Sequence, residues 1–110
     1  MKTLASIAHG YADTLIARTA NNMLRLGRPL VLVPRETPLS LPDLENMVAA
    51  KRAGAVILPP VAAYYFRPRS VTEMTDFFVG KILDVLGIEH TLYQRWGEQR
   101  ITGEQRITGQ

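Results

Sequence analysis

Two short apolar runs in this chain are each followed by side chains that could do chemistry. Arg35 and Glu36 follow the run Leu30–Val33 after a single proline, and the run Ala55–Leu58 is followed by Tyr64, Tyr65 and Arg67. A guanidinium matches a phosphate with two parallel hydrogen bonds, a glutamate can carry a proton, and a tyrosine offers a hydroxyl and an aromatic face. These residues indicate a site for a phosphate-bearing ligand. The alternative is that Arg35 and Glu36 form a surface pair and the tyrosines fill a core edge, and position alone does not decide.

Two cations lie among apolar residues at helical spacing. Lys81 falls four residues after Phe77 and four before Val85, so it lies in the apolar stripe of the last predicted helix. Arg18 is placed similarly in the first predicted helix. A cation in such a stripe either extends its apolar stem toward water or meets a buried anion. The pattern favours extension to water for Lys81 and keeps the buried anion as the alternative.

The elements that would position these residues follow from hydrophobic periodicity. Helical spacing predicts a helix from about Thr3 to Leu26. Gly10 is its weak point, because glycine inside a helix costs about 1 kcal/mol relative to alanine. The unbroken apolar runs Leu30–Val33 and Ala55–Leu58 predict strands that are covered on both faces, as in a parallel sheet.

Two further helices carry the same start signal, a serine followed three residues later by an acidic residue. The pairs are Ser40 with Asp43 and Ser70 with Glu73, and the helices are expected to end near Arg52–Gly54 and Gly87. The last helix is expected to carry on one face Met74, Phe77, Phe78, Ile82 and Val85. The order helix, strand, helix, strand, helix predicts an α/β domain with a parallel sheet. Two strands are too few for a stable sheet, so we expect others to complete it or to come from another chain.

Composition excludes several classes of protein. Hydrophobic residues make up 46% of the 110 residues and charged residues 21%, which is typical of a globular domain rather than a disordered chain. The sequence has no cysteine, and its two histidines, His9 and His90, are far apart, so no metal centre is predicted. His9 is interpreted as structural rather than as a catalytic base. The net charge of +3 comes from dispersed arginines, which favours small phosphate ligands over nucleic acid. No signal peptide or membrane span is predicted, and a cytoplasmic location is expected.

Four segments of the chain carry distinctive motifs. The first segment, from Met1 to Asp13, reads MKTLASIAHGYAD, and the second, from Val33 to Ser40, reads VPRETPLS. The third, from Ala63 to Pro68, reads AYYFRP, and the fourth, from Asp76 to Asp84, reads DFFVGKILD. Together they resemble the flavin prenyltransferase family, whose members were earlier described as aromatic acid decarboxylases of the UbiX type. The resemblance runs from Met1 to about Trp96, and the second and third segments are highly specific in combination.

The resemblance implies a flavodoxin-like, doubly wound α/β domain that assembles as a dodecamer. It implies transfer of a dimethylallyl group from dimethylallyl phosphate to reduced FMN, without a metal, to make prenylated FMN for a UbiD-type decarboxylase. Carried over by position, the FMN contacts are Met1, Lys2, Thr3 and Arg35. The dimethylallyl phosphate contacts are Arg18, Arg25, Tyr65 and Lys81. Glu36 is the candidate for proton transfer.

The chain departs from the family pattern in four respects. The family begins with a strand and a glycine-rich loop that hold the FMN phosphate, and residues 1–96 match only the later part of the family pattern, so we expect an N-terminally truncated domain. Arg25 replaces a common lysine, which keeps the charge but changes its geometry. Asp43 replaces a common histidine, and Asn21–Asn22 replaces a less polar pair.

From these departures we expect the isolated chain to be inactive. The alternative is a non-catalytic, oligomer-forming part of the same family. Residues 97–110 form a polar tail in which the hexapeptide EQRITG occurs twice, and two copies are too few for a repeat fold.

Overall fold

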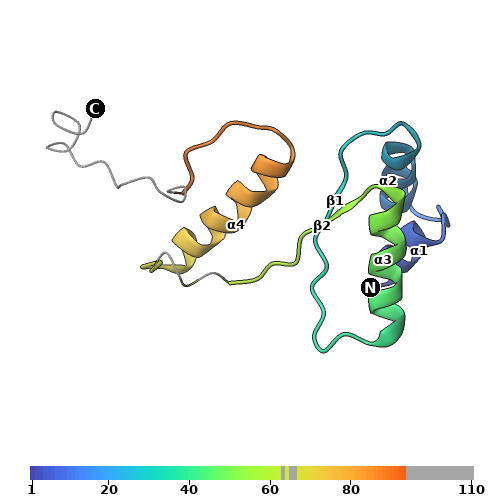
Figure 1. The fold of residues 1–110 in the computed structure, drawn as a ribbon, viewed down its shortest axis with the longest axis horizontal. Helices are drawn as coiled ribbons and strands as arrows, with labels where there is room; N and C mark the ends of the chain where they lie inside the picture. The colour runs from blue at the N-terminus through green and yellow to red at the C-terminus, as the bar shows by residue number, and fades with distance from the viewer. Residues whose placement is uncertain (63, 65–66, 94–110) are drawn as a thin grey trace, which may run out of the picture.

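The computed structural model describes residues 1–62, 64 and 67–93. Its elements, labelled in Figure 1, are α1 (Lys2–Ala8), α2 (Leu15–Arg25), β1 (Val31–Leu32), α3 (Leu41–Ala53), β2 (Val56–Ile57) and α4 (Val71–Val85). The predicted alternation of helices and strands is therefore confirmed. Tyr65 and the tail at 97–110, with its duplicated hexapeptide, lie outside the described residues.

The single helix predicted from Thr3 to Leu26 is wrong, because two helices occupy this segment. Helix α1 ends at His9, and Gly10 follows with a φ of +70°, a left-handed conformation that glycine adopts without steric cost. Helix α2 then starts afresh at Thr14, whose side chain accepts a hydrogen bond of 3.1 Å from the backbone N–H of Ala17. The helical spacing of apolar residues continues across the turn between α1 and α2. Periodicity alone therefore did not reveal the turn at Gly10 and the cap at Thr14.

Helix α3 has the predicted start and end. The Ser40 hydroxyl accepts from the Asp43 N–H at 3.2 Å, and the Asp43 carboxylate accepts from the Ser40 N–H at 3.1 Å. This reciprocal capping box satisfies two backbone donors that the first turn leaves without helical partners. Gly54 ends the helix with a φ of +117°, in the left-handed conformation typical of a helix C-terminus.

The two strands are parallel, as predicted, but shorter. Val31 pairs with Val56 and Leu32 with Ile57, and the backbone N–H of Val56 donates to the Leu30 carbonyl at 2.9 Å. All four paired residues are half-buried, so the expectation of strands covered on both faces is wrong within the described residues. Leu32 and Ile57 pack against the core on one side and keep the rest of their surface accessible.

The core is small and lies between α1, α3 and the sheet. Its buried members are Leu4, Ala50 and Ala55, and the half-buried side chains packed on them are Met1, Leu24, Leu30, Leu32, Met47 and Ile57. Helix α1 packs against both α3 and α2. In Figure 1 the strands lie between this group of helices and α4, which begins fourteen residues after the end of β2.

Helix α4 begins with half of the predicted capping box. The Ser70 hydroxyl accepts from the Glu73 N–H at 3.1 Å, but the Glu73 carboxylate accepts from the N–H of Arg69 instead of Ser70. Phe77 is buried on the predicted apolar face, whereas Val85 is 39% exposed, because it lies in the last turn. Gly87 follows with a φ of +74°. Within the described residues, no helix combines the length and hydrophobicity needed to cross a membrane.

Candidate functional site

A pocket opens at the carboxyl end of β1, where open α/β sheets usually bind ligands. Its volume is about 230 Å³, and it is lined by Met1, Thr3, Leu4, Ile7, Leu32, Val33, Pro34 and Arg35. Helix α1 supplies one wall, and β1 with the residues after it supplies the other. Two segments about thirty residues apart in sequence are thus brought together by the packing of α1 beside the sheet.

The chemistry of this pocket is apolar at its base and polar at its edge. Leu4 and Ile7 are 7% and 4% exposed, while the Thr3 hydroxyl and the Arg35 guanidinium belong to exposed residues. Such a pocket suits a ligand with a flat apolar part and a polar or anionic substituent. Sites for cofactor-sized ligands usually measure roughly 300–1,000 Å³, so this pocket encloses only part of such a ligand.

Three of the four residues predicted to contact FMN line this pocket, namely Met1, Thr3 and Arg35. Lys2 is exposed in the first turn of α1 and is not among the lining residues. Glu36 is also exposed, and it follows Arg35 directly in the segment after β1. The structure therefore gathers most of the predicted FMN contacts and leaves Glu36 accessible to a ligand held there.

Arg18 and Arg25 are both exposed on α2. They are seven residues apart, so they face nearly the same side of the helix and lie about 10 Å apart along its axis. Neither lines the pocket beside β1. The structure thus presents them as a pair of cations on one helix face, separate from Arg35.

Lys81 lies on α4, where aromatic residues surround the end of its side chain. Its half-buried side chain places Nζ over two aromatic rings, 5.1 Å from the centroid of Phe77 and 5.2 Å from that of Tyr93. Aromatic faces carry negative charge density and stabilise a cation at this distance. Tyr65, the remaining predicted contact, lies outside the described residues.

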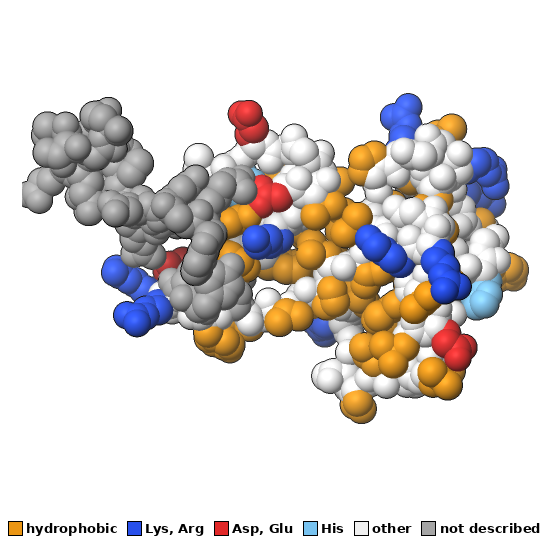
Figure 2. Space-filling view, in the orientation of Figure 1, with side chains coloured by type: hydrophobic (Ala, Val, Ile, Leu, Met, Phe, Trp, Pro, Cys, Tyr) orange, Lys and Arg blue, Asp and Glu red, His pale blue; other side chains and the backbone are white. Residues whose placement is uncertain are grey.

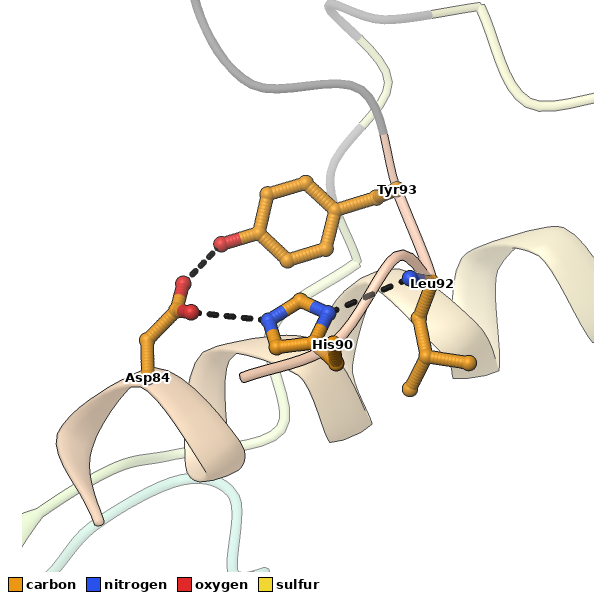
Figure 3. A network of polar contacts seen from close by, with 4 residues as sticks. All are labelled: Asp84, His90, Leu92 and Tyr93. Carbon is orange, nitrogen blue, oxygen red and sulfur yellow. Dashed lines mark hydrogen bonds and ion pairs between the residues drawn. The ribbon is translucent and has the colours of Figure 1, made fainter. Parts of the chain in front are cut away.

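Sequence reasoning missed a polar network at the end of α4, drawn in Figure 3. The Asp84 carboxylate accepts hydrogen bonds from the Tyr93 hydroxyl and from His90 Nε2, the latter at 2.7 Å. His90 Nδ1 accepts from the backbone N–H of Leu92 at 3.1 Å. Gly80 was the available signal, because a glycine in the middle of a predicted helix often marks a close approach of other atoms.

The interpretation of His9 as structural agrees with its contact. Its Nε2 lies 3.0 Å from Asn46 Oδ1, so the ring joins the end of α1 to α3. The ring is exposed and does not line the pocket beside β1. His9 thus helps to fix α1, which carries one wall of that pocket.

Comparison with known proteins identifies the family. The Flavoprotein family model matches residues 1–94, which is most of the chain. The chain belongs to the Flavoprotein family. The flavin prenyltransferase UbiX of Methanothermobacter thermautotrophicus is 52% identical to this flavoprotein over 96 residues, which cover 87% of this chain and 50% of the relative. The flavin prenyltransferase UbiX of Alkalihalophilus pseudofirmus is 51% identical over 98 residues, which cover 89% and 49%.

Solved structures place this flavoprotein in the same fold. AnUbiX (PadA1), in complex with FMN and dimethylallyl pyrophosphate, matches with a TM-score of 0.86 and 47% identity, over 90% of this chain and 53% of that one. A dodecameric FMN-dependent UbiX-like decarboxylase from Escherichia coli O157:H7 matches with a TM-score of 0.83 and 47% identity, over 88% and 52%. The predicted flavodoxin-like α/β fold and the predicted family are confirmed. The chain spans about half the length of the relatives it matches.

Proposed function

We propose that this chain supplies one part of the site of a flavin prenyltransferase, which joins the dimethylallyl group of dimethylallyl phosphate to reduced FMN. The observation that carries the proposal is the pocket beside β1, because Met1, Thr3 and Arg35 meet there. The resemblance assigns these same three residues to FMN. A solved relative with 47% identity is described as a complex with FMN and dimethylallyl pyrophosphate, which supports both ligands.

The residues of the pocket fit part of FMN. Leu4 and Ile7 offer an apolar base for a flat ring system, and Thr3 and Arg35 offer hydrogen-bond donors at its edge. The volume of about 230 Å³ is too small for a whole flavin nucleotide, so other residues must hold the remainder. FMN held by this chain alone is therefore expected to bind weakly.

The cations have a separate role in the proposal. When bound and reduced, FMN supplies the nucleophilic positions, N5 and C6, to which the allyl group is joined. Arg18, Arg25 and Lys81, with Tyr65, bind the phosphate of the second substrate and stabilise the charge that it gains as the allylic C–O bond breaks. Glu36, which follows Arg35 directly, carries a proton beside the FMN pocket. The product, prenylated FMN, passes to a UbiD-type decarboxylase in the cytoplasm.

Flavin titration tests the pocket. FMN fluorescence is followed as the chain is added, for the wild type, for Arg35→Ala and for Arg28→Ala as a matched control. Arg28 is exposed between α2 and β1 and does not line the pocket. We expect weak binding by the wild type and by Arg28→Ala. Arg35→Ala should bind about tenfold more weakly or worse, because a charge-assisted hydrogen bond contributes about 1.5–3 kcal/mol. Equal affinities for the two variants, or no binding by the wild type, would exclude the pocket as an FMN site.

A second candidate function is assembly with other subunits, favoured by apolar residues on the surface. Leu15 and Ile16 on α2 are 79% and 68% exposed. Figure 2 shows that apolar side chains also gather on the face turned to the viewer. A pocket of about 450 Å³ between α3 and β2 is lined by the apolar Met47, Val48 and Ile57 and by Lys51 and Arg52. Exposed apolar patches of this kind mark interaction sites. Light scattering after size-exclusion chromatography tests this candidate, and a monomer would contradict it. An oligomer would support it if Leu15→Glu dissociates the oligomer while the control Thr19→Glu leaves it intact.

A further inference from the structure

The segment after α4 folds back onto the helix and is fastened to it at two points. Beyond Gly87 the chain reverses, and both His90 and Tyr93 reach the carboxylate of Asp84 (Figure 3). The His90 side chain is 5% exposed and that of Asp84 is 27% exposed, so the contact is largely shielded from water. Hydrogen bonds to a carboxylate in such surroundings are stronger than those between neutral groups. We call Asp84, His90 and Tyr93 the α4 clasp.

Gly80 makes the clasp possible. A Cβ at this position would overlap the ring of Tyr93 and would lie 2.7 Å from Cε1 of His90. Only a residue without a side chain lets both rings lie directly on the helix backbone. The ring of Tyr93 is thereby held against Phe77, with the centroids 4.8 Å apart, and against His90, with the centroids 5.1 Å apart. Tyr93 is therefore fixed by its hydroxyl and by the two rings packed against it.

The hydrogen bonds of the clasp match one tautomer of a neutral His90 ring. The backbone N–H of Leu92 donates to His90 Nδ1, so that nitrogen carries no proton. The proton of a neutral imidazole then lies on Nε2, which donates to Asp84 Oδ1. A neutral ring satisfies both hydrogen bonds, whereas a protonated one would set two donors against each other at Nδ1. Both ring nitrogens of His90 are thereby used within the clasp.

Lys81 is in contact with the aromatic ring that the clasp fixes. Lys81 and Asp84 are three residues apart on the helix, a spacing at which a lysine and a carboxylate are neighbours. In the clasp, Asp84 Oδ1 faces His90 and Oδ2 faces Tyr93. The ammonium of Lys81 lies instead over the rings of Phe77 and Tyr93. Aromatic faces stabilise the cation without a formal counter-charge, so its N–H groups remain able to bind an anion.

We propose that Tyr93 is a positioning residue for Lys81: locked by the α4 clasp, its ring holds the Lys81 ammonium in place to receive the phosphate of the prenyl donor. This inference rests on the proposed function, which assigns Lys81 to that phosphate. It adds residues outside the motif segments that carry the family resemblance, since Tyr93 and His90 follow the segment Asp76–Asp84. In this arrangement Tyr93 touches the lysine and acts on the phosphate only through it.

Two readouts test the proposal on the whole chain. Proton–carbon NMR spectra report the Hε signals of each lysine, and aromatic ring currents shift those of a lysine held over a ring. Phosphorus NMR titrations with dimethylallyl phosphate, with and without FMN, report phosphate binding. The variants are Tyr93→Leu, which removes the ring, Tyr93→Phe, which keeps the ring but removes the hydroxyl bonded to Asp84, and Tyr11→Leu, a control at an exposed tyrosine.

We expect the Lys81 Hε signals to be shifted relative to those of the exposed Lys51 in the wild type and in Tyr11→Leu. Tyr93→Leu should lose most of this shift and bind dimethylallyl phosphate about fivefold more weakly, as the loss of one cation–π contact predicts. Tyr93→Phe should lie between the two, because its ring is no longer fastened to Asp84.

Two results would overturn the proposal. One is a Lys81 shift in Tyr93→Leu equal to that of the wild type, which would mean that the ring does not hold the lysine. The other is a lost shift with unchanged affinity for dimethylallyl phosphate, which would mean that the contact does not serve binding. If the wild type binds no dimethylallyl phosphate under either condition, the proposed function fails at this site and the positioning role fails with it. In that case, Lys81 Hε signals that are shifted in the wild type and lose the shift in Tyr93→Leu would show that the ring does hold the lysine. The failure would then lie in the proposed phosphate binding and not in the contact between Tyr93 and Lys81.

Discussion

Gly80→Ala should destabilise α4, although helix propensity alone predicts the opposite. In a helix interior, alanine is about 1 kcal/mol more favourable than glycine. The added Cβ, however, overlaps the Tyr93 ring and lies 2.7 Å from Cε1 of His90. Displacing both rings breaks two hydrogen bonds to the Asp84 carboxylate, each worth about 1.5–3 kcal/mol. The loss of roughly 3–6 kcal/mol exceeds the gain, so we expect a net destabilisation of about 2–5 kcal/mol.

Hydrogen exchange is the appropriate assay, because it reports the protection of the α4 amides separately from that of the α1–α3 core, from which α4 lies apart in Figure 1. The protection factors of the amides of Phe77–Asp84 should fall in Gly80→Ala. Thr75→Ala is the control on the same helix: it brings a propensity gain of up to about 0.7 kcal/mol and removes only an exposed hydrogen bond to the Val71 carbonyl, so it should leave protection unchanged or slightly higher. Stronger protection in Gly80→Ala than in the wild type would refute the packing of Tyr93 and His90 on Gly80.

Three further changes test the elements that carry the pocket. Ser40→Ala should lower the free energy of unfolding by about 1 kcal/mol through loss of the α3 cap, measured as a shift of the urea midpoint that Ser6→Ala does not reproduce. Gly54→Ala should cost about 1–2 kcal/mol in the same assay, because the φ of +117° is unfavourable for a residue with a Cβ; an unchanged midpoint contradicts that backbone conformation. His9→Ala should cost about 1 kcal/mol by removing the hydrogen bond to Asn46, and Asn46→Ala should add nothing to it in a double-mutant cycle.

Local signals predicted the local features of the fold. The capping box at Ser40 and Asp43 and the left-handed glycine at Gly54 depend on a few neighbouring residues, and both were found where the sequence indicates. The break between α1 and α2 depends on competition between periodicity and the Gly10 turn, and periodicity alone gave the wrong answer. The strands were found at their predicted places, but their length and coverage depend on what packs on the sheet, which no local pattern records.

For the candidate site too, the sequence predicted some features and not others. Arg35 was expected at the carboxyl end of a strand from position alone, and the structure places it there. Met1 and Thr3 were predicted as FMN contacts only through the resemblance to a family. No spacing rule connects the start of a helix with a loop about thirty residues later. The clasp of Asp84, His90 and Tyr93 was missed, because it requires the chain to reverse at Gly87 and no periodicity extends across such a turn. The contact of Lys81 with the ring of Tyr93 was missed for the same reason, because Tyr93 lies beyond that turn.

The place of Met1 in the wall of the pocket has a consequence for anything attached to the backbone before it. A segment joined to the Met1 amino group starts at the pocket itself, so the covalent connection delivers it there without a search through solution. A short flexible connection of this kind gives an effective concentration in the millimolar range. The same segment supplied as a separate chain would have to bind by its own affinity. An affinity tag therefore belongs at the other end of the chain, where it cannot compete for the pocket.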